Sequence, residues 1–420
     1  MKIIKLIIKI LIEIFYYIFK YKNNEDIIIT ILDNIADYNI IFIKIFQWCW
    51  MNNQYLTDKI KNKFYSYTTN TPYVDSDINF KSLINLYLIA KEKKDNFELY
   101  DIKPINSGTI SLIFRGKLNN NEIIIKVLRN NIKENLNNDL NLLTKIELIL
   151  YNIPYYSKFF CNKIFSKNKL NILNQVNFNN ECENILLFHK NFHTKNITIP
   201  NVYESYTKLD SNIIIMDYIN GKHLSELNNE ELDYYFNPFM KFIMNSIFIK
   251  NIFHCDLHQG NILFLKKELN GKIIYNIGII DMGMISTINI DDVNFIYLWL
   301  NGIFNYKFIE FIEFMKNKNN YLYIFDNYLK INECMDYLLD LYEKKEIFHN
   351  FENNKVLIND IYYFLFILKK FKCEISSKYN FFILSLIPIF NLIITLGPNI
   401  EKKKYLKDKL EKMTNIYISD

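Results

Sequence analysis

The sequence contains few cysteines, few arginines and little net charge. No C-x-x-C pair occurs among the six cysteines, and they lie far apart, so the sequence indicates neither a structural zinc site nor a disulfide framework. We expect buried thiols at the cysteine positions, which are Cys49, Cys161, Cys182, Cys255, Cys334 and Cys373. Arginine stands only at Arg115 and Arg129, and the other basic residues are almost all lysines. A net charge of +5, mixed in sign along 420 residues, gives no reason to expect nucleic acid as a partner.

The composition is typical of a chain that folds around a sizeable core. Half of the residues are hydrophobic and 23% are charged, with 34 Phe and 31 Tyr. These values exclude global disorder, collagen and a small disulfide scaffold. A chain of 420 residues is longer than an ordinary single domain, so we expect two or three packed units.

Two apolar segments raise the question of a membrane span. Residues 1–20 carry charges at steps of three and four, on one face of an amphipathic helix; these are Lys2, Lys5, Lys9 and Glu13. Charges in every turn argue against a transmembrane span and a secretory signal. Three interpretations stay open: a helix packed on its own domain, a membrane-surface helix and an organelle presequence. Residues 381–396 contain Ser385, Pro388 and Asn391 and are short for a bilayer, so we predict a core helix there.

The pattern of elements changes at about Tyr100. Up to that point, long apolar runs with little strand-like alternation predict a helical extension. Beyond it, the sequence predicts strands at 109–116 and 122–129 with a turn at 118–121, helices at about 132–150 and 180–190, and a strand at 213–218. The rest is mostly helical, except for a hairpin at 261–265 and 272–280 whose strands are separated by Asn270-Gly271.

The most informative stretch is H-C-D-L-H-Q-G-N at residues 254–261, followed by Asp281-Met282-Gly283. Phosphoryl transfer from a nucleotide needs a carboxylate to orient or deprotonate the acceptor, and oxygen ligands to hold Mg²⁺. Asp256 and Asn261 have the five-residue spacing of the kinase catalytic loop, and Asp281 stands where the Asp of D-F-G would be. We therefore predict Asp256 as the base or orienting carboxylate, and Asn261 and Asp281 as metal ligands.

A transition-metal site is an alternative interpretation of the same stretch. His254 and His258 form an H-x-x-x-H pattern beside carboxylates. The sequence offers no convincing third ligand elsewhere, which disfavours this alternative.

A kinase-like site also requires a nucleotide loop and a strand lysine upstream. Lys126 lies in I-I-I-K-V, which is similar to the V-A-I-K strand whose lysine holds the nucleotide phosphates. The predicted phosphate-facing loop before the first strand consists of Asn106, Ser107, Gly108 and Thr109. We choose Glu181 as the acid that holds Lys126, with Glu147 and Glu183 as other possibilities. The predicted hinge beside the adenine is the strand end that carries Met216 and Tyr218.

Together these motifs resemble the UbiB-type (ADCK-like) atypical kinases, from about residue 35 to about residue 400. The family's H-A-D-P-H-P-G-N is similar to residues 254–261, its D-F-G to residues 281–283 and its E-A-x-N to residues 181–184. The family also has a K-x-G-Q signature in a helical extension, which resembles Lys44-Ile45-Phe46-Gln47. The resemblance implies that Lys44 and Gln47 bear on the nucleotide site.

The sequence departs from the family pattern at three places. Phe46 replaces the glycine of K-x-G-Q, and Gly108 stands where the family's loop usually has alanine. An acidic E-x-D before the E-A-x-N motif is replaced by Gln-Val-Asn at residues 175–177. These departures leave open an altered or weakened enzyme.

We therefore expect an α+β, bilobal protein-kinase-like fold with a mostly helical C-terminal lobe. The expected parts are an N-terminal helical extension at 1–100, an N-lobe at 101–217 and a C-lobe at 218–420. The resemblance implies kinase or ATPase activity with ATP or ADP and Mg²⁺, linked to the biosynthesis of ubiquinone or related isoprenoid lipids. It further implies a membrane surface or isoprenoid lipid as partner, together with lipid-biosynthesis proteins. We expect a membrane-associated intracellular protein, with the mitochondrion as the suspected compartment.

Two other functions remain open. H-x-D-x-H-x-x-N followed by I-I-D is also similar to small-molecule phosphotransferases of the aminoglycoside or choline kinase type. Two features argue against these enzymes. They usually begin near their nucleotide lobe, whereas about one hundred residues precede that lobe here, and they lack a K-x-G-Q-like helix. The second alternative is a catalytically silent nucleotide-binding scaffold, which the intact metal ligands disfavour.

Overall fold

The computed structural model describes residues 71–152, 163–194, 196–349 and 354–397, together with isolated positions between residues 25 and 66. The predicted amphipathic helix at residues 1–20, and Lys44 and Gln47, lie outside the described residues. Two compact units are present: a first unit within Met1–Leu186 and Pro200–Tyr218, and a second unit within Leu187–Ile199 and Ile219–Asp420. The predicted extension and lobe boundaries stay predictions.

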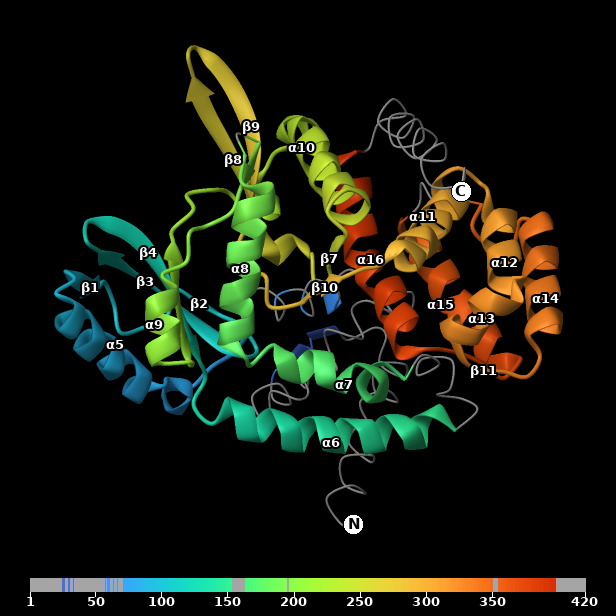
Figure 1. The fold of residues 1–420 in the computed structure, drawn as a ribbon, viewed down its shortest axis with the longest axis horizontal. Helices are drawn as coiled ribbons and strands as arrows, with labels where there is room; N and C mark the ends of the chain where they lie inside the picture. Colours follow the sequence, from blue (N-terminus) through green and yellow to red (C-terminus); the bar gives the residue numbers. More distant parts are fainter. Residues whose placement is uncertain are drawn as a thin grey trace. The chain divides into compact units, whose positions relative to one another are not determined.

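The first unit is built on an antiparallel sheet. Its strands are β1 (Phe97–Leu99), β2 (Asn106–Ser107), β3 (Ser111–Leu118), β4 (Asn121–Leu128) and β6 (Ile213–Asp217). The order in the sheet is β1-β3-β4-β6, and β2 also pairs with β3 (Figure 1). Asn119 and Asn120 form the two-residue turn between β3 and β4, both with positive φ, which asparagine tolerates better than most residues. The predicted hairpin is confirmed.

One face of this sheet packs on helix α5 (Phe80–Lys93). Leu83 and Leu86 of α5 share a buried core with Phe114, Ile125 and Ile215 of the sheet. The helix begins at Asn79, whose side chain accepts a hydrogen bond from the Ser82 backbone N–H. The prediction of helix up to Tyr100 is wrong for β1, because pairing with β3 overrides its local propensity.

Four further helices begin in or belong to the first unit, namely α6 (Ile132–Tyr151), α7 (Ile164–Asn174), α8 (Phe178–Phe192) and α9 (Glu204–Leu209). The predicted helices at 132–150 and 180–190 are confirmed as α6 and α8. Helix α7 was not predicted, because its sequence is rich in asparagine and lysine and the side chain of its N-cap residue, Lys163, makes no capping hydrogen bond. The Glu147 carboxylate of α6 accepts hydrogen bonds from the backbone N–H and hydroxyl of Ser166, which ties α7 to α6.

The second unit has short sheets and many helices. Its strands are β5 (Ile197–Thr198), β7 (Ile252–His254), β8 (Ile262–Leu269), β9 (Lys272–Ile279), β10 (Ile285–Thr287), β11 (Phe325–Tyr328) and β12 (Cys373–Ile375). Its helices are α10 (Asn229–Phe248), α11 (Ile290–Phe304), α12 (Phe308–Lys316), α13 (Lys318–Ile324), α14 (Ile331–Glu343), α15 (Asn354–Lys370) and α16 (Ser377–Leu396). Ile197 of β5 pairs in parallel with Ile277 of β9, so this segment groups with the second unit.

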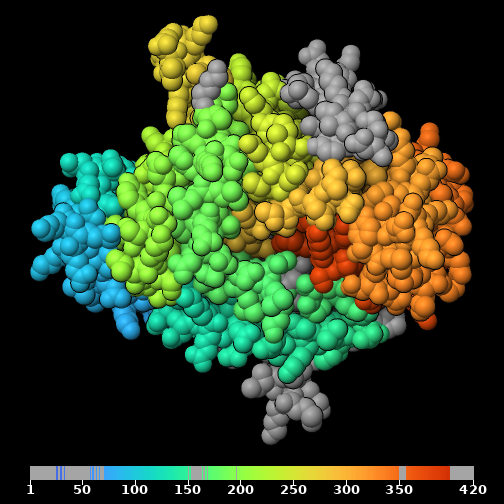
Figure 2. Space-filling model, in the orientation of Figure 1, coloured from blue at the N-terminus to red at the C-terminus, as the bar shows by residue number. Residues whose placement is uncertain are grey.

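The β8–β9 hairpin positions the second unit's predicted metal ligands. Its turn is Asn270-Gly271, with positive φ at both residues, as the sequence predicts. Residues 266–273 are exposed, and Figures 1 and 2 show this end of the hairpin, in yellow, extending away from the rest of the second unit. The opposite end is buried and leads directly into Asn261 and Ile280.

Helix α16 is the only helix of the described residues that is long and apolar enough to cross a membrane. Its most apolar window is 72% buried inside the protein. Burial of this extent agrees with the predicted core helix at 381–396. The four described cysteines, Cys182, Cys255, Cys334 and Cys373, are buried free thiols, also as predicted.

Asp360 of α15 gives the second unit a pH-dependent stability. Its carboxylate accepts a hydrogen bond of 2.8 Å from the Phe348 backbone N–H, but partial burial dominates and raises the pKa of Asp360 to about 6. Since this pKa is higher in the folded protein than in the unfolded chain, the free energy of unfolding should fall as pH rises from about 4 to about 6.

Asp360→Asn keeps an oxygen acceptor and removes the charge. We expect the variant to gain about 1 kcal/mol in free energy of unfolding at about pH 8, and much less at about pH 4. Chemical denaturation of both proteins at the two pH values measures the difference. An equal gain at both pH values would contradict the assigned pKa.

Candidate nucleotide and metal site

Lys126 lies in the middle of the first unit's sheet. On β4 it stands opposite Ile113 of β3 and Ile214 of β6, so strands flank it on both sides. Only 5% of Lys126 is exposed to solvent. A buried ammonium group requires a charged or polar partner, because leaving it unpaired costs several kcal/mol.

Glu181 of α8 supplies that partner. The Lys126 Nζ and the Glu181 Oε1 are 2.6 Å apart, and both side chains are about 5% exposed. The other two candidates differ: Glu147 is bonded to Ser166, and Glu183 is exposed. The structure thus brings together Lys126 and the carboxylate that the sequence favoured.

The predicted phosphate-facing loop leaves β2 and turns into β3. Asn106 and Ser107 form β2, Ser107 is 1% exposed, and Thr109 is 9% exposed. The Gly108 N–H donates to the Ser111 carbonyl at 2.9 Å. The Ser107 hydroxyl and the Gly108 carbonyl both accept hydrogen bonds from Arg129, at 2.8 and 3.1 Å. Hydrogen bonds within the unit therefore hold this loop.

The predicted hinge segment is the end of β6. Met216 is 3% exposed and pairs with Ile124 of β4. The Tyr218 N–H donates to the Glu122 carbonyl at 3.0 Å, and the Tyr218 ring lies under the Arg115 guanidinium, 4.0 Å from its centroid. These contacts fix the chain direction where it leaves the sheet.

In the second unit, pairing of two short strands places Asp256. β7 ends at His254, which stands opposite Ile285 of β10. The next residue, Cys255, donates its N–H to the Met284 carbonyl at 2.9 Å. Asp256 follows directly on a short loop that leads to Asn261.

Asn261 and Asp281 are brought to the same end of the β8–β9 hairpin. Ile262 stands opposite Ile279, and the Ile280 N–H donates to the Asn261 carbonyl at 3.1 Å, so Asp281 follows at once. The Asn261 Nδ2 donates to the Asp256 carbonyl at 2.8 Å. The Asp281 Oδ1 accepts from the Gly283 N–H at 2.9 Å. Asp256, Asn261 and Asp281 thus belong to one hydrogen-bonded cluster of loops.

His254 is a buried side chain that forms hydrogen bonds with two of these loops. It is 2% exposed, its Nε2 lies 2.7 Å from the Asp281 carbonyl, and its Nδ1 lies 3.3 Å from the Asp256 N–H. A carbonyl only accepts and an amide N–H only donates, so His254 carries its proton on Nε2. Burial lowers the pKa of His254, which keeps the ring neutral.

Both ring nitrogens of His254 are therefore occupied by backbone groups. This arrangement disfavours the alternative transition-metal site with His258. Among the described residues, no group of three or more His, Cys, Asp or Glu side chains could hold a metal ion. A carboxylate with an amide oxygen, as Asp281 and Asn261 provide, suits Mg²⁺ instead.

Arg129 is the residue that sequence reasoning missed. It follows β4 directly, is 5% exposed, and bonds the predicted nucleotide loop. Its rarity was a signal, because the whole sequence has only two arginines. Lys44 and Gln47 lie outside the described residues, so their part in the site stays a prediction.

The glycine of the loop can be tested directly. The φ of Gly108 lies outside the left-handed region, and a Cβ there would meet the Ser111 carbonyl at 3.4 Å, an ordinary contact. We expect Gly108→Ala to keep or raise the free energy of unfolding, by up to about 1 kcal/mol. Chemical denaturation measures this change.

The matched control is Gly116→Ala on the adjoining β3. A Cβ at Gly116 would clash with the Glu98 carbonyl oxygen of β1, so this variant should be clearly less stable. If Gly108→Ala lowered the free energy of unfolding as much as Gly116→Ala does, the backbone conformation described for the loop would be contradicted.

Three relatives named "Probable protein kinase UbiB" illustrate what the chain is similar to. The protein of Tolumonas auensis is 26% identical over 208 residues, that of Aeromonas salmonicida 25% over 209, and that of Aliivibrio fischeri 24% over 218. These matches cover 48 to 50% of this chain but only 37 to 39% of the relatives. The chain thus matches well under half of the length of these proteins.

A solved structure of the Rv3197–erythromycin complex from Mycobacterium tuberculosis matches 63% of this chain and 66% of its own, with 14% identity and a TM-score of 0.40. The model of the "ABC1 atypical kinase-like domain" matches residues 81–310, which is more than half of the chain. This span contains the Lys126–Glu181 pair and the loops with Asp256, Asn261 and Asp281, in keeping with the predicted α+β kinase-like fold. The chain therefore belongs to the ABC1 atypical kinase-like family, and it is similar to proteins of the UbiB type.

Proposed function

We propose that the protein is a UbiB-type atypical kinase or ATPase that binds ATP or ADP with Mg²⁺. The observation that carries this proposal is the buried ion pair of Lys126 and Glu181. In kinases a strand lysine, held by a helix glutamate, contacts the nucleotide phosphates. Membership of an atypical kinase-like family supports phosphotransferase chemistry.

The donors of the second unit fit a magnesium ion. Because the Asn261 Nδ2 is bonded to the Asp256 carbonyl, the Oδ1 of the same amide would be the atom that binds the metal. Asp281 adds a carboxylate, oriented by the Gly283 N–H. We propose Asn261 and Asp281 as the magnesium ligands. A bound Mg²⁺ would neutralise phosphate charge and orient the transferred group.

The remaining roles follow from chemistry and position. Asp256 would orient or deprotonate the phosphoryl acceptor, with its backbone held by His254 and Asn261. The loop Asn106, Ser107, Gly108 and Thr109 would face the phosphates, and the β6 end with Met216 and Tyr218 would border the adenine. We further propose that Lys44 and Gln47 act on this site.

The biological setting is proposed from the UbiB-type resemblance. It supports a link to ubiquinone or a related isoprenoid lipid, a membrane surface as partner and contacts with lipid-biosynthesis proteins. The amphipathic pattern of residues 1–20 agrees with membrane association. A mitochondrial location belongs to the same proposal.

Asp281→Asn tests the metal assignment. Losing the carboxylate should abolish Mg²⁺-dependent stabilisation by ATP or ADP in thermal shift, and lower phosphate release by about 100-fold or more. The matched control is Asp291→Asn, which removes an exposed carboxylate in the first turn of α11 and should behave as wild type. Wild-type turnover in Asp281→Asn would overturn the assignment.

Phosphate release, phosphorylation of added acceptors and nucleotide binding together distinguish the three functions. Phosphate release stimulated by anionic liposomes supports a UbiB-like enzyme at a membrane. Phosphorylation of amino-sugars or choline would instead favour the small-molecule phosphotransferase. Nucleotide binding without any turnover, with Asp281→Asn altering only the affinity for Mg²⁺, would favour the silent scaffold.

The Lys126–Glu181 pair allows function to be separated from stability. Lys126→Met leaves Glu181 buried without its ion-pair partner and should lower the free energy of unfolding by about 3 to 5 kcal/mol. Adding Glu181→Met removes both charges and should restore most of that loss. We expect both variants to lose turnover, because neither presents a cation to the phosphates.

Chemical denaturation and phosphate-release assays on the two variants show whether the pair is needed for turnover or only for stability. Recovery of stability without recovery of turnover supports the catalytic role of Lys126. Turnover at the wild-type rate in the double variant would show that the pair is only structural.

A further inference from the structure

We propose that Arg129 is a positioning residue that holds the loop 106–109 in its phosphate-facing conformation and locks it to the segment 71–77 ahead of α5. This inference rests on the proposed nucleotide site. Arg129 itself need not touch the nucleotide, since it is 5% exposed and acts through the loop.

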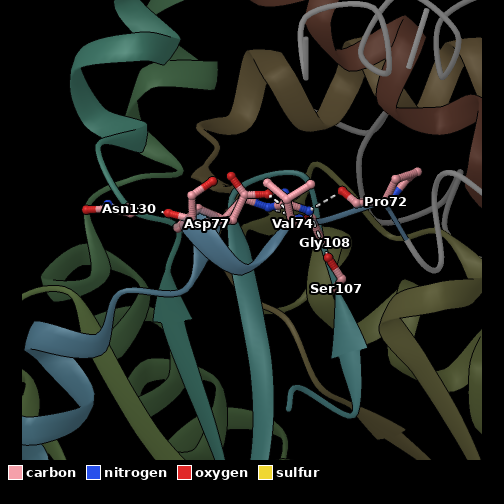
Figure 3. Close-up of polar contacts among 8 residues, drawn as sticks. Pro72, Val74, Asp77, Ser107, Gly108 and Asn130 are labelled. Carbon is pink, nitrogen blue, oxygen red and sulfur yellow. Dashed lines mark hydrogen bonds and ion pairs between the residues drawn. The ribbon is translucent and has the colours of Figure 1, made fainter. Parts of the chain in front are cut away.

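The guanidinium of Arg129 lies at the centre of three chain segments. Its donors reach the Asp77 carboxylate at 2.7 Å, the Pro72 carbonyl at 3.0 Å, the Ser107 hydroxyl at 2.8 Å and the Gly108 carbonyl at 3.1 Å. In Figure 3, Asp77 lies toward one end of this cluster and Pro72 toward the other, with Gly108 and Ser107 between them. One side chain therefore bonds both the loop and the segment before α5.

Backbone hydrogen bonds reinforce the same connection. The Arg129 N–H donates to the Ile110 carbonyl at 3.0 Å, and the Thr71 N–H donates to the Ser107 carbonyl at 2.6 Å. The Asn130 N–H donates to the Asp77 carbonyl at 2.8 Å. The loop, the end of β4 and the segment 71–77 thus form one hydrogen-bonded assembly.

Arginine is suited to this position by its geometry. A planar guanidinium donates in several fixed directions at once, whereas a lysine ammonium is a single compact charge on a flexible stem. In a nearly water-free environment, a lysine would leave some of the four acceptors without a partner, and each one lost costs about 1 to 3 kcal/mol. The loop would then be held less firmly.

Loss of the Arg129 contacts should affect the binding of phosphate-bearing ligands selectively. If the loop faces the phosphates, loosening it weakens binding of a nucleotide diphosphate or triphosphate but leaves binding of adenosine unchanged. A general loss of folding would weaken both ligands alike. The ratio of the two affinities is therefore a measure of positioning.

The experiment compares Arg129→Lys with wild type. We expect Mg²⁺-ADP binding, measured by calorimetry, to weaken by about tenfold or more while adenosine binding changes by less than about twofold. Hydrogen exchange of the amides at 107–110 should become faster. Asp77→Asn is a milder change that weakens the contacts of this carboxylate with Arg129 and with the Val74 N–H, and it should shift both measurements in the same direction by a smaller factor.

The control is Tyr206→Phe, which removes a partly buried hydrogen bond to Asp95 in the same unit, away from the loop. It should leave the affinity ratio and the exchange at 107–110 at wild-type values. Unchanged exchange in Arg129→Lys and Asp77→Asn would overturn the positioning role, and faster exchange with an unchanged affinity ratio would overturn its link to phosphate. If wild type binds no Mg²⁺-ADP, the proposed function fails, and hydrogen exchange alone decides the positioning role.

Discussion

Lys126 and Glu181 place opposite charges 2.6 Å apart in a region that nearly excludes water. Such a pair persists only where strand and helix keep a fixed geometry, because either charge alone would cost several kcal/mol in the interior. The rest of the first unit keeps this geometry fixed. Strands β3 and β6 flank β4, and apolar side chains of α5 pack against the other face of the sheet. The helix that carries Glu181 starts 52 residues after Lys126, so the pair is a product of the fold and not of local sequence.

In the second unit, the polar residues of the predicted site lie on loops, and these loops have to be held in place. Loops are imprecise unless their backbone groups are bonded, and here a neutral, buried His254 bonds the loops of both Asp256 and Asp281. The β8–β9 pairing does the same for Asn261. The arrangement makes His254 a support for the predicted metal site and explains why it is poorly suited to be a ligand itself.

Much of the local structure could be predicted, because turns and burial patterns are encoded over few residues. Asn119-Asn120 and Asn270-Gly271 tolerate positive φ, and both hairpins form where they indicate. The predictions failed where pairing with distant strands decides the outcome, as in β1, or where a polar helix such as α7 is stabilised by its neighbour. Arg129 was missed for the same reason: its four acceptors belong to residues that lie 21 to 57 positions away in the sequence.

The sequence by itself determined the chemical types and their order along the chain: loop, strand lysine, helix acid, D-x-x-x-x-N and D-x-G. Those motifs were enough to identify the kinase-like family, since few folds need that ordered set. Only the tertiary structure decided that Glu181 and not Glu147 or Glu183 meets Lys126, that His254 has both nitrogens occupied, and that Arg129 joins the predicted phosphate-facing loop to the segment before α5. Partner choice depends on distance and burial, and these become defined only when segments far apart in sequence pack together.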